Sequence, residues 1–500
     1  MACCLDRLAA TAAGGILAVV CLTLAPPVAL GATYFVDASA PDDGGTGSRT
    51  RPKKYLVSGL RLMSARGGDT LVLEPGIYAG RRNSILPTTL LHGARAGFKE
   101  AARSYNIIRA SVDGGATIRG VLDMPLDSAF LQFEGLKWDS LEEKKIVGHH
   151  LKFIRCAFEN GPATGNVNTV TIGTNDRTPG ARDVLVEDSW VYGPGGRYKL
   201  LVFNSQRVVL RRVVVRHDAG WIPSDDNPQG GIAIYNSQDV ALQNGIVLDS
   251  DLDYADWLGA IAHVQNRIDG TLVSSRISVR GSIVLNIANV GVSYEGNGAI
   301  LDAQIANTVI WKVARSALTL NGGSHLVLAH NLTVGDVSAG DAINLFGGKD
   351  ATLLVRNSIV STGSTRAFYR QRGLLEENNN NCYSMYRYAP CASIGDTSLD
   401  PRRNGLSRLP RVDEGSALDR ARLGANVTTR IGVSGTLYGE PGFDESSREA
   451  LWPWPLELRL KTDLCEGGIR RGLCGTGLSL TEYIWNFLDA ATQGHEPPGG

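Results

Sequence analysis

Three stretches near the middle of the chain decide the fold: "RDVLVEDSWVYG" (182–193), "QRVVLRRVVVRH" (206–217) and "QDVALQNGIVLD" (238–249) align with one another. The series continues in "LDAQIANTVIWKV" (301–313), "HLVLAHNLTVGDV" (325–337) and "TLLVRNSIVSTG" (352–363). Asn307, Asn331 and Asn357 take the same place in successive units, at separations of 24 (331−307) and 26 (357−331) residues. Each unit also holds a second short apolar stretch, such as "GIAIYNS" (231–237), "GVSYEGN" (291–297) or "DAINLFG" (341–347). Self-similarity at a fixed period indicates a repeat architecture.

The length of the unit suits one coil of three short strands joined by turns. A single coil cannot bury its inner face, so successive coils stack around a continuous apolar interior. Asn fits a repeated turn because it tolerates the left-handed conformation, and its amide can bond the Asn stacked above it. The unit lacks the LxxLxL frame of a leucine-rich repeat and is shorter than a propeller blade. The sequence therefore predicts an all-β protein, a right-handed parallel β-helix.

Composition agrees with this fold and excludes some partners. The 500 residues include 50 Lys and Arg against 50 Asp and Glu, so no net field favours nucleic acid or an acidic membrane. Aromatic residues make up 7% of the chain while glycine reaches 59 residues, as thin aliphatic layers and tight turns require. We expect a monomer.

The first 32 residues are predicted to be a secretory signal peptide. Arg7 precedes an apolar run over 8–24, and small residues around Gly31 follow Pro26 and Pro27. No later stretch reaches the roughly 18 apolar residues of a transmembrane helix. The prediction is a secreted or periplasmic chain without a membrane span.

Five of the eight cysteines lie beyond this segment. The pairs Cys382 and Cys391, and Cys465 and Cys474, are each nine residues apart (391−382 and 474−465), which suits local disulfides in an oxidising compartment. Zinc ligation is the competing interpretation, although the CxxC spacing and neighbouring histidines that it uses are missing. Cys156 is expected to be a buried free thiol.

Both ends of the repeat region resemble a known group of proteins. The stretch 33–80, ending in "GDTLVLEPGIYAG", resembles the opening of secreted pectate-lyase-like β-helix proteins, and "LDPRRNGLSRLPRVDEGSALDRARLGANV" (399–427) resembles their closing segment. The resemblance covers roughly 33–427 and implies a β-helix. It implies little about activity, because the superfamily includes lyases, hydrolases, epimerases and non-catalytic adhesins.

Residues 428–500 form a separate tail. Ser479 and Glu482 have the spacing of a capping box, so "SLTEYIWNFLDAA" (479–491) is predicted to contain a helix. Since the end of a stack needs a cover, we expect a disulfide-pinned C-terminal cap. A sugar-binding module that uses Trp452 and Trp454 is the alternative.

The densest cluster of polar residues runs over 195–226. A polysaccharide lyase needs a cation for the substrate carboxylate, a base for the C5 proton and an acid for the leaving oxygen. We expect Lys199 or Tyr198 to be the base, with Arg197 and Arg216 binding carboxylate and His217 as supporting acid. "RHD" (216–218) resembles the Arg-His-Gly phrase of chondroitinase-B-like and alginate lyases. Further residues expected to bind substrate are Asp218, Trp221, Tyr235 and His263. The alternative is that these basic residues are the solvated side of ordinary strands.

Two other patterns compete for the chemistry. "SDDNPQGGIAIYNSQDVALQN" (224–244) resembles polygalacturonase-type hydrolases, whose paired carboxylates act as acid and base. The Gly-His-Gly phrase of that family is missing, and His263 stands in "GAIAHVQN" instead. Alternating carboxylates at Asp249, Asp251 and Asp253 are a possible Ca²⁺ site, with an exposed acidic turn as the alternative.

The sequence thus favours a lyase acting on an acidic, uronate-containing polysaccharide by β-elimination. A non-catalytic adhesin or glycan-binding β-helix, and a polygalacturonase-like hydrolase, stay open as alternatives.

Overall fold

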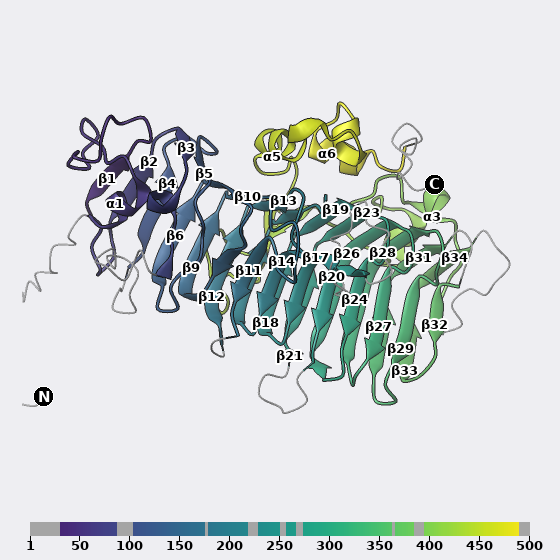
Figure 1. Cartoon of the computed structure of the whole chain (residues 1–500). Coiled ribbons are helices and arrows are strands. Elements are labelled where there is room, and N and C mark those ends of the chain that lie inside the picture. Colours follow the sequence, from purple (N-terminus) through teal and green to yellow (C-terminus); the bar gives the residue numbers. More distant parts are fainter. Residues whose placement is uncertain are drawn as a thin grey trace, which may run out of the picture.

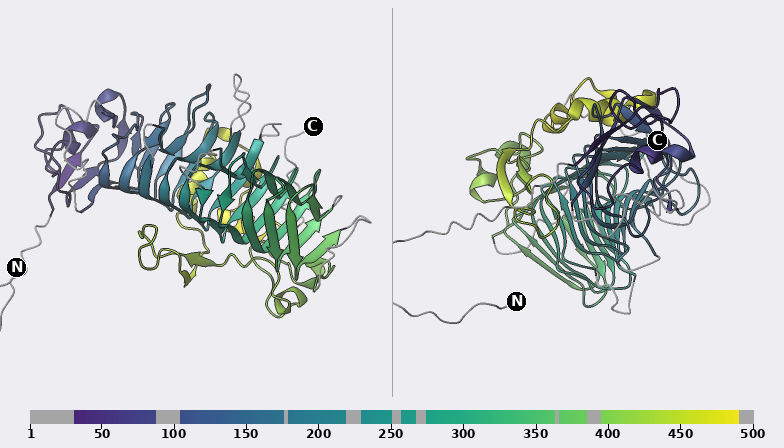
Figure 2. Two further views of the ribbon diagram at one scale, coloured as in Figure 1. Left: turned by 90° about the horizontal axis from the view of Figure 1, so that it is seen from below. Right: turned by 90° about the vertical axis from the view of Figure 1, so that its left-hand side faces the viewer.

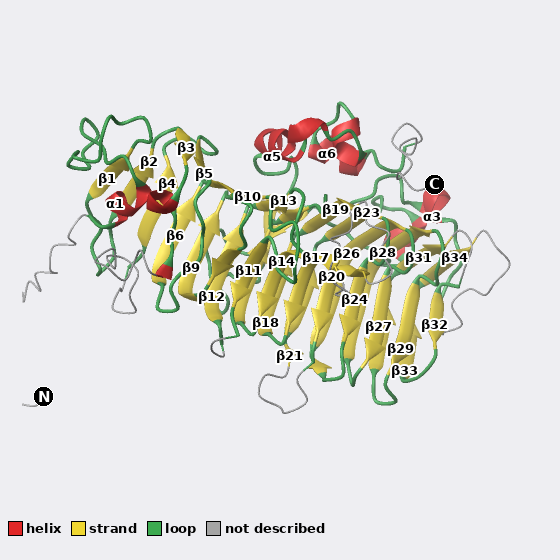
Figure 3. Cartoon of the chain, in the orientation of Figure 1, coloured by secondary structure: helices red, strands yellow, loops and turns green. Residues whose placement is uncertain are grey.

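In the computed structural model, parallel strands stack into an elongated β-helix with the C-terminal tail along its side (Figures 1 and 2). The structure describes residues 31–87, 104–175, 179–218, 229–250, 257–266, 274–362, 366–384 and 395–489. The predicted signal peptide therefore lies almost wholly outside the described residues. Strands dominate, and the longest helices gather in the tail (Figure 3). The predicted parallel β-helix is confirmed.

One wall of the helix is a parallel sheet of nine strands. Each strand pairs with the strand of the next coil, from β8 to β32 in chain order. The members are β8 (Lys144–Ile146), β11 (Val170–Gly173), β14 (Tyr198–Phe203), β17 (Gln229–Tyr235), β20 (Trp257–Val264), β24 (Val292–Glu295), β27 (Leu318–Gly322), β29 (Ile343–Gly347) and β32 (Phe368–Arg370).

The other two walls belong to one sheet of 23 strands that bends at a corner. The strands before the corner are β1 (Thr33–Val36), β2 (Thr70–Leu73), β4 (Asn106–Ala110), β6 (Ala129–Glu134), β9 (Gly148–Ile154), β12 (Ala181–Glu187), β15 (Gln206–Arg211), β18 (Gln238–Gln243), β22 (Ile277–Arg280), β30 (Thr352–Arg356) and β33 (Leu374–Asn378). Those after it are β3 (Gly76–Tyr78), β5 (Ala116–Ile118), β7 (Lys137–Asp139), β10 (Ala157–Glu159), β13 (Trp190–Tyr192), β16 (Val214–Val215), β19 (Ile246–Ser250), β23 (Ile283–Ile287), β31 (Ile359–Thr362) and β34 (Asn381–Ser384). β26 (Ala303–Val313) and β28 (Leu326–Val337) run through the corner.

The corner is where the repeated asparagines act. Asn307, Asn331 and Asn357 all have φ near +50°, the left-handed conformation that Asn tolerates better than other non-glycine residues. The predicted contact between stacked amides is present near the end of this row, where Asn379 Nδ2 donates to Asn357 Oδ1 at 2.8 Å. Asn307 and Asn331 instead bond the backbone of the returning C-terminal segment.

The remaining elements lie at the ends, on loops or in the tail. They are β21 (Ser274–Ser275), β25 (Ile300–Leu301), β35 (Thr429–Ile431), β36 (Ser446–Ala450), α1 (Leu56–Leu60), α3 (Pro401–Asn404), α4 (Ala417–Arg420), α5 (Glu457–Leu464), α6 (Leu480–Trp485) and the 3₁₀ turns η1 (Arg81–Asn83), η2 (Glu466–Gly468) and η3 (Gly472–Gly475). The capping box at the start of α6 is present.

The described part of the tail runs back along the side of the stack (Figures 1 and 2). After α4 the chain returns over the corner, where Asn307 Oδ1 accepts from Asn426 N and Asn244 Oδ1 accepts from Ile431 N. α5 and α6 then cover an apolar outer face that includes Trp190, Val214 and Ile246 (Figure 1). The corner amides and this apolar face give the tail a long lateral binding surface, which a cover for the end of the stack does not need.

Candidate functional site

The outer face of the nine-stranded sheet carries a groove with convergent polar groups. In β17, Ile232 and Ile234 belong to the internal core, so Ala233 and Tyr235 face outward. The strand register aligns residues of neighbouring coils with Ala233 and with Tyr235, so two rows of outward-facing side chains run along the sheet. The first row is Lys145, Thr171, Leu201, Ala233, Ala262, Ser293, Thr319, Asn344 and Tyr369. The second row contains Gly173, Phe203, Tyr235, Val264 and Glu295, and Asn321 pairs with Phe346 farther along it.

A groove of about 840 Å³ lies over the N-terminal part of this face. That volume is in the range of small-molecule sites. β8, β11, β14 and β17 supply the floor, and the 123–127 segment and the loops at 166–168 and 174–175 line its sides. Its polar lining includes Arg197, Tyr198, Tyr235, Glu143, Lys145, Asn166, Asn168 and Thr171.

Arg197, Tyr198 and Tyr235 form a connected cluster in this groove. The two phenol oxygens lie 2.6 Å apart. Arg197 Nη2 donates to Tyr198 Oη at 2.8 Å, and Nη1 donates to Asn166 Oδ1 at 2.7 Å. The guanidinium carbon also lies 4.5 Å from the centroid of the Tyr198 ring. One fixed cation and two linked hydroxyls therefore meet at the groove wall.

The environment holds protons on both tyrosines. Burial, followed by the neighbouring Tyr235, raises the pKa of Tyr198 well above its usual value, although Arg197 opposes the shift. Burial also raises the pKa of Tyr235, while hydrogen bonds from Tyr198 and the charge of Arg197 favour its phenolate. Both groups are phenols at neutral pH, and the Tyr198 hydroxyl together with Arg197 stabilises a phenolate at Tyr235.

Glu143 serves the groove as a structural acceptor. Its Oε1 accepts from the Asn168 backbone N–H and side-chain amide, at 3.2 and 3.0 Å, and from Thr171 Oγ1 at 2.5 Å. Lys145 Nζ lies 3.9 Å from Glu143 Oε2, and this lysine side chain is half exposed. Glu143 therefore orders the floor, and Lys145 presents a positive charge above it.

Sequence reasoning missed Glu295, which lies in the same outward row as Tyr235, two coils further along. Burial raises its pKa to about 7, against hydrogen bonds with Asn321 and Ser293 that lower it. The repeat alignment contained the signal, because "GVSYEGN" (291–297) places Glu295 where "GIAIYNS" (231–237) places Tyr235.

Lys199, the expected base, is not in the groove. Its side chain is fully buried, and Nζ donates to the carbonyl oxygens of Gly193 and Gly195. A lysine bound to turn carbonyls and shielded from solvent cannot meet a polymer. Lys199 is buried because the carbonyls of the 193–196 turn are shielded from water and need a hydrogen-bond donor.

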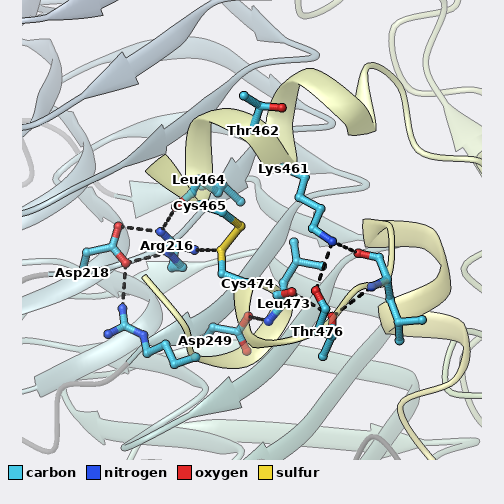
Figure 4. The surroundings of a disulfide bond; sticks show 12 residues. Arg216, Asp218, Asp249, Lys461, Thr462, Leu464, Cys465, Leu473, Cys474 and Thr476 are labelled. Carbon is cyan, nitrogen blue, oxygen red and sulfur yellow. Dashed lines mark hydrogen bonds and ion pairs between the residues drawn. A yellow bond between two sulfur atoms is a disulfide. The ribbon is translucent and has the colours of Figure 1, made fainter. Parts of the chain in front are cut away.

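Arg216 and Asp218, expected to bind substrate, instead anchor the tail (Figure 4). Arg216 Nε donates to Asp218 Oδ1 at 2.6 Å, Nη1 to Cys474 Sγ at 3.0 Å, and Nη2 to the Leu464 carbonyl. Arg471 also pairs with Asp218 Oδ1, at 2.7 Å. The 465–474 disulfide predicted from the spacing is present beside them.

The two candidate histidines are both buried. His217 Nε2 lies 3.3 Å from the Arg197 carbonyl oxygen, so this residue supports the backbone of the cluster from below. His263 points into the coil interior, where its ring lies 4.6 Å from Tyr294 and its two nitrogens have no hydrogen-bond partner within the described chain. Burial lowers the pKa of His263 to about 3. Its expected role in substrate binding is wrong because alternation turns the residue inward.

Asp249 does not fit a Ca²⁺ site. Asn286 Nδ2 and Tyr483 Oη donate to its Oδ1, at 2.7 and 2.8 Å, and Leu473 N donates to Oδ2 at 2.8 Å. The two oxygens thus bind the tail. Among the described residues, no three or more His, Cys, Asp or Glu side chains are grouped to hold a metal.

Several predicted residues lie outside the described ranges, namely Trp221, Asp251, Asp253 and Cys391. The pairing of Cys382 with Cys391 therefore stays a prediction. Asp225 and Asp226, the paired carboxylates of the hydrolase pattern, also lie outside the described ranges. Cys156 is a buried free thiol, as predicted. Within the described ranges, no helix has the length and apolar character needed to cross a membrane.

A second cleft, of about 660 Å³, separates the tail from the outer face of β5, β7, β10 and β13. Its charged groups are paired: Lys137 Nζ lies 3.0 Å from Glu159 and 2.8 Å from Glu466, and Arg119 Nε lies 3.0 Å from Asp139. Arg119 and Glu466 are more than half exposed, whereas Lys137 and Glu159 are largely buried. The groove on the nine-stranded sheet is therefore the stronger candidate.

No protein-family model matches the chain, and no curated protein matches it. Solved structures do match. The chain is similar to pectate lyase Pel9A at 15% identity and TM-score 0.41, over 78% of this chain and 91% of that one. XylC, solved with xylose, matches at 7% identity and TM-score 0.47, over 74% and 87%. The A-module of the Azotobacter vinelandii mannuronan C-5 epimerase AlgE4 matches at 11% and 0.43, over 73% and 100%. The fold assignment rests on this chain's own strand pairing, and these values add nothing about its chemistry.

Proposed function

We propose that the protein is a polysaccharide lyase that cleaves an acidic, uronate-containing polymer by β-elimination on the outer face of the nine-stranded sheet. The observation that supports this function is the cluster of Arg197, Tyr198 and Tyr235 in a groove of about 840 Å³. It combines a carboxylate-binding cation with a proton-transfer group. Lys145 adds a second positive charge to the floor.

In this proposal Arg197 pairs with the uronate carboxylate, which makes the C5 proton more acidic. Tyr235, as a phenolate stabilised by the Tyr198 hydroxyl, removes that proton. The C5 electron pair forms the C4–C5 double bond as the C4–O bond breaks, and the regenerated Tyr235 phenol returns its proton to the leaving oxygen. Proton transfer and charge neutralisation of this kind are the main contributions available to such a site.

The raised pKa of Tyr235 has a kinetic consequence. The basic form is a minor species at neutral pH, so the rate should increase tenfold for each pH unit until the pKa of Tyr235 is reached. The expected optimum is therefore alkaline.

The test incubates the mature protein with pectate, alginate and glycosaminoglycans while ultraviolet absorbance reports the unsaturated product. We expect product from one of these polymers, and a loss of at least about a hundredfold in kcat for Tyr235→Phe and Arg197→Ala. Tyr438→Phe, in the tail, is the matched control and should retain full activity. Reducing ends without absorbance would contradict β-elimination and favour a hydrolase.

The second candidate is a glycan-binding protein without catalysis. The raised pKa values of Tyr198 and Tyr235 favour it, because two neutral phenols are good hydrogen-bond partners for sugar hydroxyls. Binding of an acidic polymer without product, lost in Arg197→Ala, would establish this function.

A further inference from the structure

The C-terminal coils carry an aromatic pair on the same outer face as the proposed site. Phe346 in β29 and Tyr369 in β32 have ring centroids 5.3 Å apart. Phe346 is 38% exposed, although its neighbours Ile343 and Leu345 are fully buried in the core. Asn344 and Tyr369 belong to the first outward row, and Phe346 pairs with Asn321 beyond Glu295. An exposed aromatic ring that packs against a second, partly exposed ring on this face indicates a contact surface.

Charge surrounds this pair. The Arg366 guanidinium lies 4.3 Å from the Tyr369 centroid. Asp341 fixes it through two contacts, Nε to Oδ1 at 3.0 Å and Nη2 to Oδ2 at 2.9 Å. Arg370 follows Tyr369 and is exposed, but it pairs with the inward-facing Leu345, so it does not belong to the outward rows. The Arg366 guanidinium beside the Tyr369 ring is therefore the cation that this surface offers to an anionic ligand.

An amide beside the rings also has unused hydrogen-bonding capacity. Asn344 is only 5% exposed, and its Nδ2 donates to Ser316 Oγ at 2.5 Å. Its Oδ1 has no hydrogen-bond partner among the described residues. Because an unsatisfied buried acceptor is costly, a donor reaching it after a small side-chain movement gains a bond at little further expense.

The spacing between the two surfaces fits one polymer. From β17 to β29 the pairing crosses four strand steps, through β20, β24 and β27. At about 4.8 Å a step, Tyr235 and Phe346 lie roughly 19 Å apart along the stack. The intervening outward residues include Ala262, Val264 and Ser293, which are short enough to form a floor.

We propose that Phe346, Tyr369 and Arg366 form a distal subsite that binds the same acidic polysaccharide roughly 19 Å from the Tyr235 cluster. The subsite rests on the proposed function for the identity of the ligand. Its rings stack against sugar faces, and Arg366 meets a uronate carboxylate. Two linked contacts on one chain raise the affinity for polymers above that for short oligosaccharides.

The test compares a Phe346→Ala/Tyr369→Ala double variant with Leu326→Ala. Leu326 is a matched control because it is 40% exposed on β28, in the neighbouring coils but on another wall. Electrophoresis through gels containing the polymer measures affinity without requiring turnover. We expect roughly tenfold weaker polymer binding in the double variant, about the effect of losing two aromatic contacts. Leu326→Ala should bind like the wild type.

The second measurement is kcat/KM on short uronate oligosaccharides, which fill only the Tyr235 site and should be turned over equally by all three proteins. Unchanged polymer affinity in the double variant, or an equal loss on short and long substrates, would overturn the distal subsite. If no substrate is turned over, the proposed lyase function fails, whereas the gel measurement still tests the subsite. Circular dichroism of each variant checks that folding is intact.

Discussion

Replacing His263 with leucine should remove a defined part of the protein's sensitivity to acid. His263 lies fully buried between inward-facing neighbours, and burial lowers its pKa to about 3 from the 6.5 of an exposed histidine. The unfolded chain therefore binds a proton below pH 6.5 that the folded chain refuses until about pH 3. Stability from the neutral ring is present above pH 6.5 and is lost as pH falls through this window.

The magnitude follows from the two pKa values. At pH 4 the unfolded histidine is almost fully protonated and the folded one only slightly, so linkage predicts a loss of about 3 kcal/mol between pH 7.5 and pH 4. His263→Leu should lack this loss. It should also be more stable than the wild type at pH 7.5, by about 1 kcal/mol or more, since two nitrogens without hydrogen-bond partners are removed.

Urea unfolding followed by far-ultraviolet circular dichroism at pH 7.5 and pH 4 measures the difference. Other groups titrate in the same range, but they are shared by both proteins and cancel. Tyr294→Phe is the control, because it removes a neighbouring hydroxyl without a partner, and burial raises the pKa of Tyr294 away from the acid range. Its offset from the wild type should not change with pH. Equal acid losses in His263→Leu and the wild type would refute the reasoning.

Three further predictions concern the groove, the turn and the corner. Burial raises the pKa of Glu295 to about 7, so a carboxylate forms beside the anionic polymer between pH 6 and pH 8. The wild type should therefore bind the polymer roughly fivefold more weakly at pH 8 than at pH 6. Glu295→Gln should abolish this pH dependence, which electrophoresis through gels containing the polymer measures. Lys199→Met should lower the free energy of unfolding by about 3 kcal/mol, because the Gly193 and Gly195 carbonyls lose their donor. The kcat of the folded variant should stay unchanged. A loss of kcat without a loss of stability would show that Lys199 is a catalytic residue. Asn307→Gly keeps the left-handed backbone but removes the two hydrogen bonds to Asn426. The free energy of unfolding should fall by about 1–2 kcal/mol, and proteolysis of the returning segment should become faster. An unaltered proteolysis rate would show that the Asn307 amide does not hold this segment on the corner.

The repeat was sufficient to predict the fold because each coil depends on its neighbours. Alternating Val, Ile and Leu predict strands that stack from coil to coil, and the recurrent Asn marks a turn position that every coil repeats. The tail was predicted as a separate segment, but its position was not. The bonds from Asn307 and Asn244 to Asn426 and Ile431 cross more than a hundred residues, and local pattern contains no information about them.

The candidate site was only partly predictable for a related reason. Arg197, Tyr198 and Tyr235 lie together because neighbouring coils bring them into contact. Lys199 and Arg216 look equally suited as residue types. In the structure, Lys199 donates to carbonyls of a turn, and Arg216 pairs with Asp218 and donates to the backbone carbonyl at the end of α5. His263 and Glu295 differ by one place in the strand alternation, which decides whether a side chain faces the core or the groove. That choice becomes clear only when the strand register is known.

The most direct test of the central claim is a crystal structure of Tyr235→Phe soaked with an acidic oligosaccharide. The proposed mechanism predicts a sugar chain on the outer face of the nine-stranded sheet, with one uronate carboxylate paired to Arg197 and its C5 facing residue 235. A sugar chain bound instead in the cleft between the tail and β7 and β10, with the Arg197 groove empty, would contradict it.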